Sequence, residues 1–176
     1  ILKSWGILKF FSVLAFSDEV GSSKPSPKIF KKAIATNPNS GVYCEYGLFL
    51  LMQNRYNDAI EQLQQASQLA SSDKQELSYG QSEKPYIETN LQREVERAPN
   101  NELIINSELL SYYLLINAYC KQHQPSISNS DNSTSLDSAG KTLNIKAQQA
   151  LQTFTEIAKK TNTPLAYRLL SYVHQS

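Results

Sequence analysis

The residue types that usually carry catalysis or bind metals are few in this chain and widely spaced. Its 176 residues include two cysteines, Cys44 and Cys120, and two histidines, His123 and His174. No Cys-x-x-Cys pair occurs, so the pattern is not typical of a zinc site. Neither histidine has a nucleophile or carboxylate at a useful spacing, and there is no glycine-rich phosphate loop. The sequence therefore predicts no catalytic residue, metal site or cofactor, and two reduced cysteines that pack as small apolar side chains.

Segment 17–30 (SDEVGSSKPSPKIF) has residue types that suggest an enzyme. Lys24-Pro25, with Pro27 and Ile29-Phe30, resembles the third motif of haloacid-dehalogenase-type phosphatases, which implies a lysine that steadies a phosphorylated aspartate. Such an enzyme also needs an Asp-x-Asp nucleophile after a buried strand and further acidic ligands for Mg²⁺. No Asp-x-Asp occurs, and the alternating β-branched runs of a parallel sheet are missing. We therefore expect that the chain is not an enzyme, and a related phosphatase is the alternative.

Composition and charge favour a folded helical domain. Hydrophobic residues make up 40% of the chain, and 17 Lys and Arg against 16 Asp and Glu leave a net charge of +1. A near-neutral chain lacks the pattern typical of proteins that bind nucleic acids or anionic membranes. The apolar stretch 7–16 is too short to span a bilayer, and no signal-peptide cleavage pattern follows it. We expect one cytoplasmic domain over 1–176, with this stretch in a buried first helix.

A repeated helical unit is clearest over residues 40–70, where two amphipathic helices are predicted at 42–53 and 57–69. Antiparallel helices approach closely only where small residues lie on the contacting ridges, and this unit has small residues at such positions. The small and large inward positions are Gly47, Ala59 and Ala66, and Tyr43, Leu50, Tyr56 and Leu63. This pattern closely resembles a tetratricopeptide repeat. The resemblance implies an all-α fold of antiparallel helical hairpins, stacked as a short right-handed solenoid.

Further units are predicted on both sides. A second hairpin has its first helix over 102–122, where Tyr112 occupies the position of Tyr43, 69 residues earlier (112 − 43). This spacing is about twice the roughly 34-residue period of the family, so one degenerate unit is expected between, with helices near 73–80 and over 84–100. The predicted units are 1–39, 40–72, 73–101 and 102–163, with a capping helix at 164–176 and inserted loops, of which 124–142 is a flexible, Ser/Asn-rich loop.

The first helices of successive hairpins line the concave face in this family, so the resemblance implies where a partner would bind. The groove-facing residues in the predicted register are Cys44, Leu48, Met52, Tyr113, Asn117, Lys121, Arg168 and Tyr172. Such a groove suits an amphipathic helix or an extended peptide with apolar anchors. Some of these residues could instead pack against a neighbouring helix or the chain's own loop.

The predicted function is therefore that of a protein–protein interaction module, an adaptor or chaperone-like scaffold that holds another protein or peptide. Besides the phosphatase-related protein, a structural subunit of a larger assembly is an alternative. The sequence does not indicate the oligomeric state.

Overall fold

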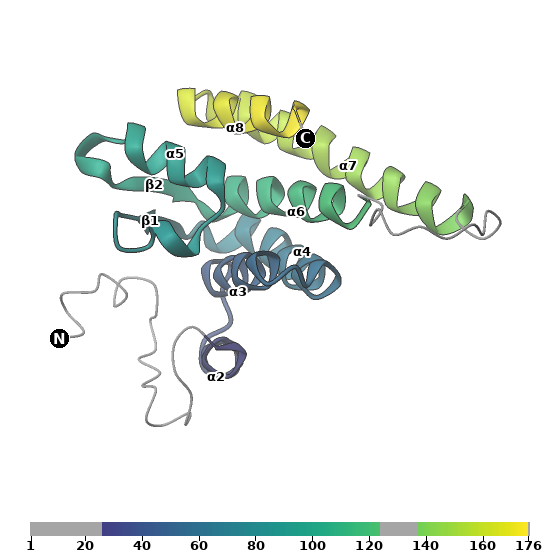
Figure 1. Cartoon of the computed structure of the whole chain (residues 1–176), viewed down its shortest axis with the longest axis horizontal. Helices are drawn as coiled ribbons and strands as arrows, with labels where there is room; N and C mark the ends of the chain where they lie inside the picture. The colour runs from purple at the N-terminus through teal and green to yellow at the C-terminus, as the bar shows by residue number, and fades with distance from the viewer. Residues whose placement is uncertain (1–25, 124–136, 176) are drawn as a thin grey trace.

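The computed structural model describes residues 26–123 and 137–175. Within these residues helices dominate and one two-stranded sheet is present (Figure 1), which confirms the prediction of a mostly helical protein. None of the described helices combines the length and apolar character that crossing a bilayer requires. The elements in chain order are α2 (Pro27–Thr36), α3 (Ser40–Met52), α4 (Tyr56–Asp73), β1 (Glu76–Tyr79), η3 (Lys84–Tyr86), α5 (Thr89–Arg97), η4 (Pro99–Asn101), β2 (Leu103–Asn106), α6 (Ser107–His123), α7 (Asp137–Thr161) and α8 (Pro164–His174).

Helices α3 and α4 form an antiparallel hairpin and confirm the helices predicted at 42–53 and 57–69. The Asn39 side chain caps α3 by accepting a hydrogen bond from the Val42 amide at 3.1 Å, which satisfies a donor that has no partner inside the helix. Asn54 has a φ of 58°, a left-handed conformation that asparagine tolerates better than most residues. The turn between the helices is therefore as tight as the sequence predicted.

Small residues bring these two helices close together. Ala59 and Ala66 are fully buried, and a Cβ atom added at Gly47 would lie 2.5 Å from Leu63 Cγ. Since real Cβ contacts are longer than this, the close approach requires glycine at position 47. The predicted small and large positions of this hairpin are thus its actual packing positions.

The helix predicted near 73–80 is wrong, because strand β1 lies there. Side chains alternate between the two faces of the sheet: Leu77, Tyr79, Leu103 and Ile105 are buried, while the residues between them are more exposed. This period of two excludes a helix. The strands are antiparallel, in the register Glu76↔Asn106, Leu77↔Ile105, Ser78↔Ile104 and Tyr79↔Leu103.

The remainder of the predicted degenerate repeat is shorter than expected. Helix α5 covers only part of 84–100, with the 3-10 turns η3 and η4 on either side. The helix predicted over 102–122 is wrong at its start, because β2 occupies 103–106 and α6 begins only at Ser107. Residues 74–106 therefore form not a helical hairpin but a strand, a short helix and a second strand, and the second strand lies beyond the predicted unit 73–101.

The 69-residue spacing of Tyr43 and Tyr112 thus has a different origin from the one predicted. Helix α4 packs directly against α6, so residues 74–106 are inserted between neighbouring helices of one stack. Along this stack α2 packs on α3, α3 on α4, α6 on α7 and α7 on α8, while α6 also contacts α3 and α8. The spacing corresponds to one hairpin plus an insertion.

A buried polar cluster joins the ends of three helices. The Asp73 carboxylate, at the end of α4, accepts hydrogen bonds from the Ser40 amide at 2.6 Å and from the Ser40 hydroxyl. The Ser40 oxygen also accepts a hydrogen bond from the Ser107 hydroxyl, with the two oxygens 2.8 Å apart, and the Ser107 amide donates to the Gln75 carbonyl at 2.8 Å. Helices α3 and α6 therefore begin next to each other, where α4 ends.

Some predictions fall on residues 1–25 and 124–136, which lie outside the described residues. These are the first helix of unit 1–39, the Lys24-Pro25 motif and most of the loop predicted at 124–142. The end of that loop prediction is wrong, because α7 begins at Asp137.

Candidate binding face

The candidate binding face is formed by α3, α6 and α8, the helices on which the sequence placed the groove. The inserted segment 74–106 lies against this face, and β1, β2 and α5 gather at one end of α6 (Figure 1). Hydrogen bonds join the insertion to each of the three helices. They form three separate contacts, described in turn from α3 to α8.

The first contact joins α3 to the sheet. The Tyr79 hydroxyl donates a hydrogen bond to Glu45 Oε1 at 2.5 Å, and a Cβ atom at Gly41 would lie 3.3 Å from Leu77 Cδ2. Burial raises the pKa of Glu45 to about 7, helped by the negative charge of Glu83, although the hydrogen bond from Tyr79 lowers it. At neutral pH this carboxyl group is therefore partly protonated.

The second contact joins α6 to the N-terminus of α5. The fully buried Tyr113 donates a hydrogen bond to Glu88 Oε1 and accepts one from Asn90 Nδ2 at 3.2 Å. Glu88 also caps α5, because its Oε2 accepts from the Asn90 amide at 2.5 Å. Burial and the nearby Glu88 carboxylate raise the pKa of Tyr113 well above its usual value, so the phenol stays protonated and donates. On its other side Tyr113 packs on Phe154 of α7, with ring centroids 6.4 Å apart.

The third contact joins α8 to the middle of α5 through Glu94, whose side chain is fully buried. Arg168 donates to Glu94 Oε2 from Nε at 2.8 Å and approaches it with a second nitrogen at 2.7 Å. Oε1 accepts from the Tyr172 hydroxyl at 2.7 Å and from Arg97 at 2.9 Å. Burial raises the pKa of this carboxyl group, but the hydrogen bonds from Arg168, Tyr172 and Arg97 outweigh it and hold the pKa below its usual value. Glu94 is thus a buried, ionised and fully paired carboxylate.

The eight residues of the predicted groove divide into three groups. Cys44, Leu48, Tyr113 and Asn117 are buried, with at most 8% of their surface exposed. They therefore do not line an open groove but pack inside the chain, which is the alternative that the sequence left open. Arg168 and Tyr172 are half-buried and bind α5. Met52 and Lys121 are exposed, at the C-terminal ends of α3 and α6. The insertion covers Tyr113, which hydrogen-bonds Glu88 and Asn90. Cys44 is buried for another reason, because α3 packs on α6 and its thiol donates to the Ser107 carbonyl at 3.5 Å.

Sequence reasoning missed the side chains on the insertion that make these contacts, chiefly Tyr79, Glu88 and Glu94. One signal was available. Leu91, Glu94 and Val95 follow the spacing of a single helix face, which places a carboxylate between two apolar residues. A charged residue on an apolar face needs a partner, because burying it unpaired would be costly.

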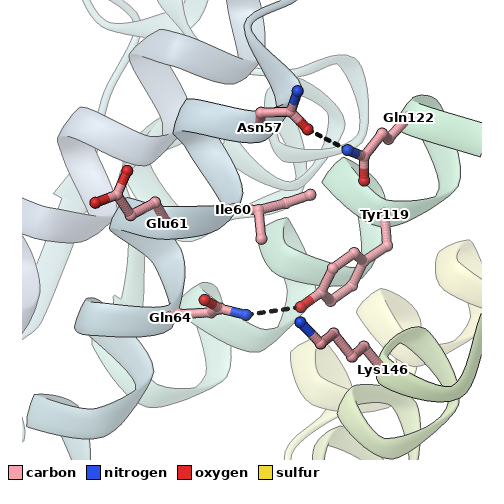
Figure 2. A pocket seen from close by; sticks show the side chains of 7 residues that line it. All are labelled: Asn57, Ile60, Glu61, Gln64, Tyr119, Gln122 and Lys146. Carbon is pink, nitrogen blue, oxygen red and sulfur yellow. Dashed lines mark hydrogen bonds between the residues drawn. The ribbon is translucent and has the colours of Figure 1, made fainter. Parts of the chain in front are cut away.

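A polar pocket lies apart from this face, between α4, α6 and α7 (Figure 2). It encloses about 250 Å³ and is lined by Asn57, Ile60, Glu61, Gln64, Tyr119, Gln122 and Lys146. Gln64 Nε2 donates to the Tyr119 hydroxyl at 2.9 Å, and Gln122 donates to Asn57. No serine, cysteine or histidine lines the pocket, so it offers no nucleophile–base pair.

The two cysteine thiols and the possible metal ligands are further candidate reactive groups of the described residues. Burial raises the pKa of the Cys44 thiol, with help from Glu45 and Asp73, and burial also raises that of Cys120. Both thiols are therefore protonated and poor nucleophiles. No group of three or more histidine, cysteine, aspartate or glutamate side chains that could hold a metal ion occurs in the described ranges.

Comparisons with protein-family models, with curated proteins and with solved structures find no match for this chain. The functional argument therefore depends on the geometry of the chain itself.

Proposed function

We propose that the chain is a protein–protein interaction module built from helical hairpins of tetratricopeptide type, with an insertion between its hairpins. In this proposal α3 with α4 and α6 with α7 are successive hairpins, and α8 is the capping helix. Contacts of α6 with both α3 and α8 support it, as does the glycine at the interface of the first hairpin. The helices α3, α6 and α8 would then line the concave face.

The observation that carries the proposal is that this face holds a helix by specific side-chain contacts. Helix α5 presents two apolar side chains, Leu91 and Val95, and one carboxylate, Glu94, all buried. Two nitrogens of Arg168 contact one oxygen of the carboxylate, Oε2, and such charge-assisted hydrogen bonds are stronger than those between neutral groups. A surface that recognises an amphipathic helix in this way has the chemistry of helix-in-groove binding proteins.

The phosphatase alternative draws no support from the described residues. It needs a parallel sheet whose strand ends carry aspartates, whereas the sheet in the described part of the chain is two-stranded and antiparallel. Its lysine motif lies in 1–25, outside the described residues.

Affinity capture combined with cross-linking tests the proposal. The purified, folded chain should capture at least one protein that is absent from a bait-free control, and cross-links should place that protein against α6 or α8. A folded, monomeric bait that enriches no protein would refute the proposal. Cross-links confined to α4 and α7 would refute the assignment of the face. Self-association of the purified chain would instead favour the structural subunit.

A further inference from the structure

The connection between the two strands, residues 80–102, is here named the flap. It contains η3, α5 and η4. The strand pairs close its base, ending at Tyr79↔Leu103, and Ser78 Oγ donates to Glu102 Oε1 at 2.6 Å beside this pair. The flap can therefore move away from α6 and α8 without breaking the sheet.

The flap is attached to the face by few elements. Helix α5 packs against α8 and against its own flanking turns η3 and η4. It has only nine residues, and so short a helix is marginal without tertiary contacts. Its contacts to the stack include the Tyr113 hydrogen bonds, the pairing of Glu94 and a hydrogen bond from Arg97 to the Tyr172 hydroxyl at 2.6 Å. Three apolar residues, Ile87, Leu91 and Val95, are also buried. Segments with few contacts open more readily than the core of a fold.

We propose that the flap is a built-in occupant of the face of α6 and α8, and that a partner helix with the same side-chain pattern displaces it. This inference rests on the proposed function. The partner is an amphipathic helix with an apolar residue, an acidic residue three positions later and an apolar residue directly after that, as in Leu91, Glu94 and Val95. A basic residue at the acidic position is excluded, because it would face Arg168.

Displacement fits the chemistry of the face better than binding beside the flap. With α5 in place Arg168 and Tyr172 are already paired with Glu94, and Tyr113 is fully buried. A partner carboxylate can take the place of Glu94 on Arg168 Nε and Nη2 only when Glu94 leaves. The apparent affinity of the partner is then reduced by the fraction of molecules in which the flap is open.

Amide hydrogen exchange of the full wild-type chain is the first test. Amides of α5 should exchange at least about tenfold faster than those of α3 and α4, which corresponds to an opening free energy lower by about 1.4 kcal/mol. Exchange of α5 at the same rate as α3 and α4, with the same denaturant dependence, would overturn the inference. In that case α5 opens only when the whole fold unfolds.

Glu94→Gln is the variant that weakens the flap. Exchange of α5 should become about tenfold faster or more, while exchange of α3 and α4 should stay as in the wild type. Glu96→Gln is the matched control, because it removes a carboxylate from the same helix that is 54% exposed and pairs only within the flap, with Lys84. If Glu94→Gln does not fold, Tyr172→Phe removes one hydrogen bond to the same carboxylate and is measured in its place.

The second test uses a labelled synthetic peptide of residues 84–101 as the probe. It should bind the Glu94→Gln chain at least about tenfold more tightly than the wild-type chain or the Glu96→Gln chain. A peptide with glutamine at position 94 should bind about tenfold less tightly than the wild-type peptide. Equal binding to all chains, or binding to none, would overturn the inference.

The two proposals fail in different ways. The wild-type chain could capture a partner on α6 or α8 while the exchange and peptide tests fail. This result would support the proposed function and refute displacement of the flap. Success of the exchange and peptide tests without any captured partner would leave a displaceable flap and refute the proposed function.

Discussion

Substitution of Glu45 by glutamine should stabilise the fold at and above neutral pH and have little effect near pH 4.5. The Glu45 carboxyl group lies between α3 and β1, where it accepts a hydrogen bond from Tyr79 and where burial raises its pKa to about 7. Glutamine has nearly the same shape and keeps an oxygen that can accept this hydrogen bond. The substitution therefore removes the charge and leaves most of the packing in place.

The sign and size of the effect follow from the two pKa values. The folded state binds the proton of Glu45 more tightly than the unfolded state, in which the pKa is near 4.5. The contribution to stability is therefore complete below about pH 4.5 and is lost as the pH rises through about 7. At about 1.4 kcal/mol per pH unit the loss is at most about 3 kcal/mol. Because the Glu45 side chain keeps some solvent contact, we expect a measured loss of about 1–2 kcal/mol.

Urea unfolding followed by circular dichroism, from about pH 5 to about pH 8, measures this effect. The variant should become more stable relative to the wild type across this range, by about 1–2 kcal/mol at the upper end. Glu61→Gln, at an exposed position on α4, is the matched control, and it should change the stability by less than about 0.5 kcal/mol throughout. A constant difference between Glu45→Gln and the wild type over the whole range would refute the reasoning.

Two further predictions concern packing, and urea unfolding tests both. Gly47→Ala should cost about 1–2 kcal/mol, since overpacking against Leu63 outweighs the better helix propensity of alanine. In a Leu63→Ala background this cost should disappear, and an unchanged cost would show that the two residues are not in contact. Leu48→Ala should cost about 2–5 kcal/mol, because only 2% of Leu48 is exposed. A loss of stability below about 1 kcal/mol would show that Leu48 is exposed, as a residue in an open groove would be.

The first hairpin was predictable because the residues that pack its two helices together lie close to one another in the sequence. Gly47 and Ala59 lie twelve residues apart on two helices joined by a tight turn, so their spacing determines which ridges meet. Asparagine at position 54 lies in the turn between these helices, and asparagine at position 39 caps the first helix. The chemistry of these residues permits few other conformations.

The insertion was not predictable in the same way. Each strand has four residues, too few for an alternating pattern to stand out from chance. The spacing of Tyr43 and Tyr112 also matched two family periods by coincidence, which favoured a helical hairpin in between. Pairing of Leu77 with Ile105 is a non-local contact, and no sequence window contains both residues.

The candidate site shows the same limit. The sequence placed Arg168 and Tyr172 on the candidate face, and both contact a segment of this same chain through Glu94. It could not identify that segment, because Glu94 lies more than 70 residues before Arg168. The predicted helix register therefore indicated which residues share a face. It could not indicate that Tyr113 is covered, because α5 and its N-terminal cap, which cover it, had been assigned to a separate repeat.

The position of the insertion explains why the stack tolerates it. The end of α4 and the start of α6 are held together by Asp73, Ser40 and Ser107, and the Gln75 carbonyl already meets the Ser107 amide. The ends of the insertion are thus as close as those of a short turn, and α4 packs directly on α6 although 33 residues lie between them. Once present, an amphipathic insertion must bury its apolar side chains, and the nearest apolar surface is the face of α3, α6 and α8. In the proposed function this insertion would determine how the face can be used, because a partner helix would have to compete with α5.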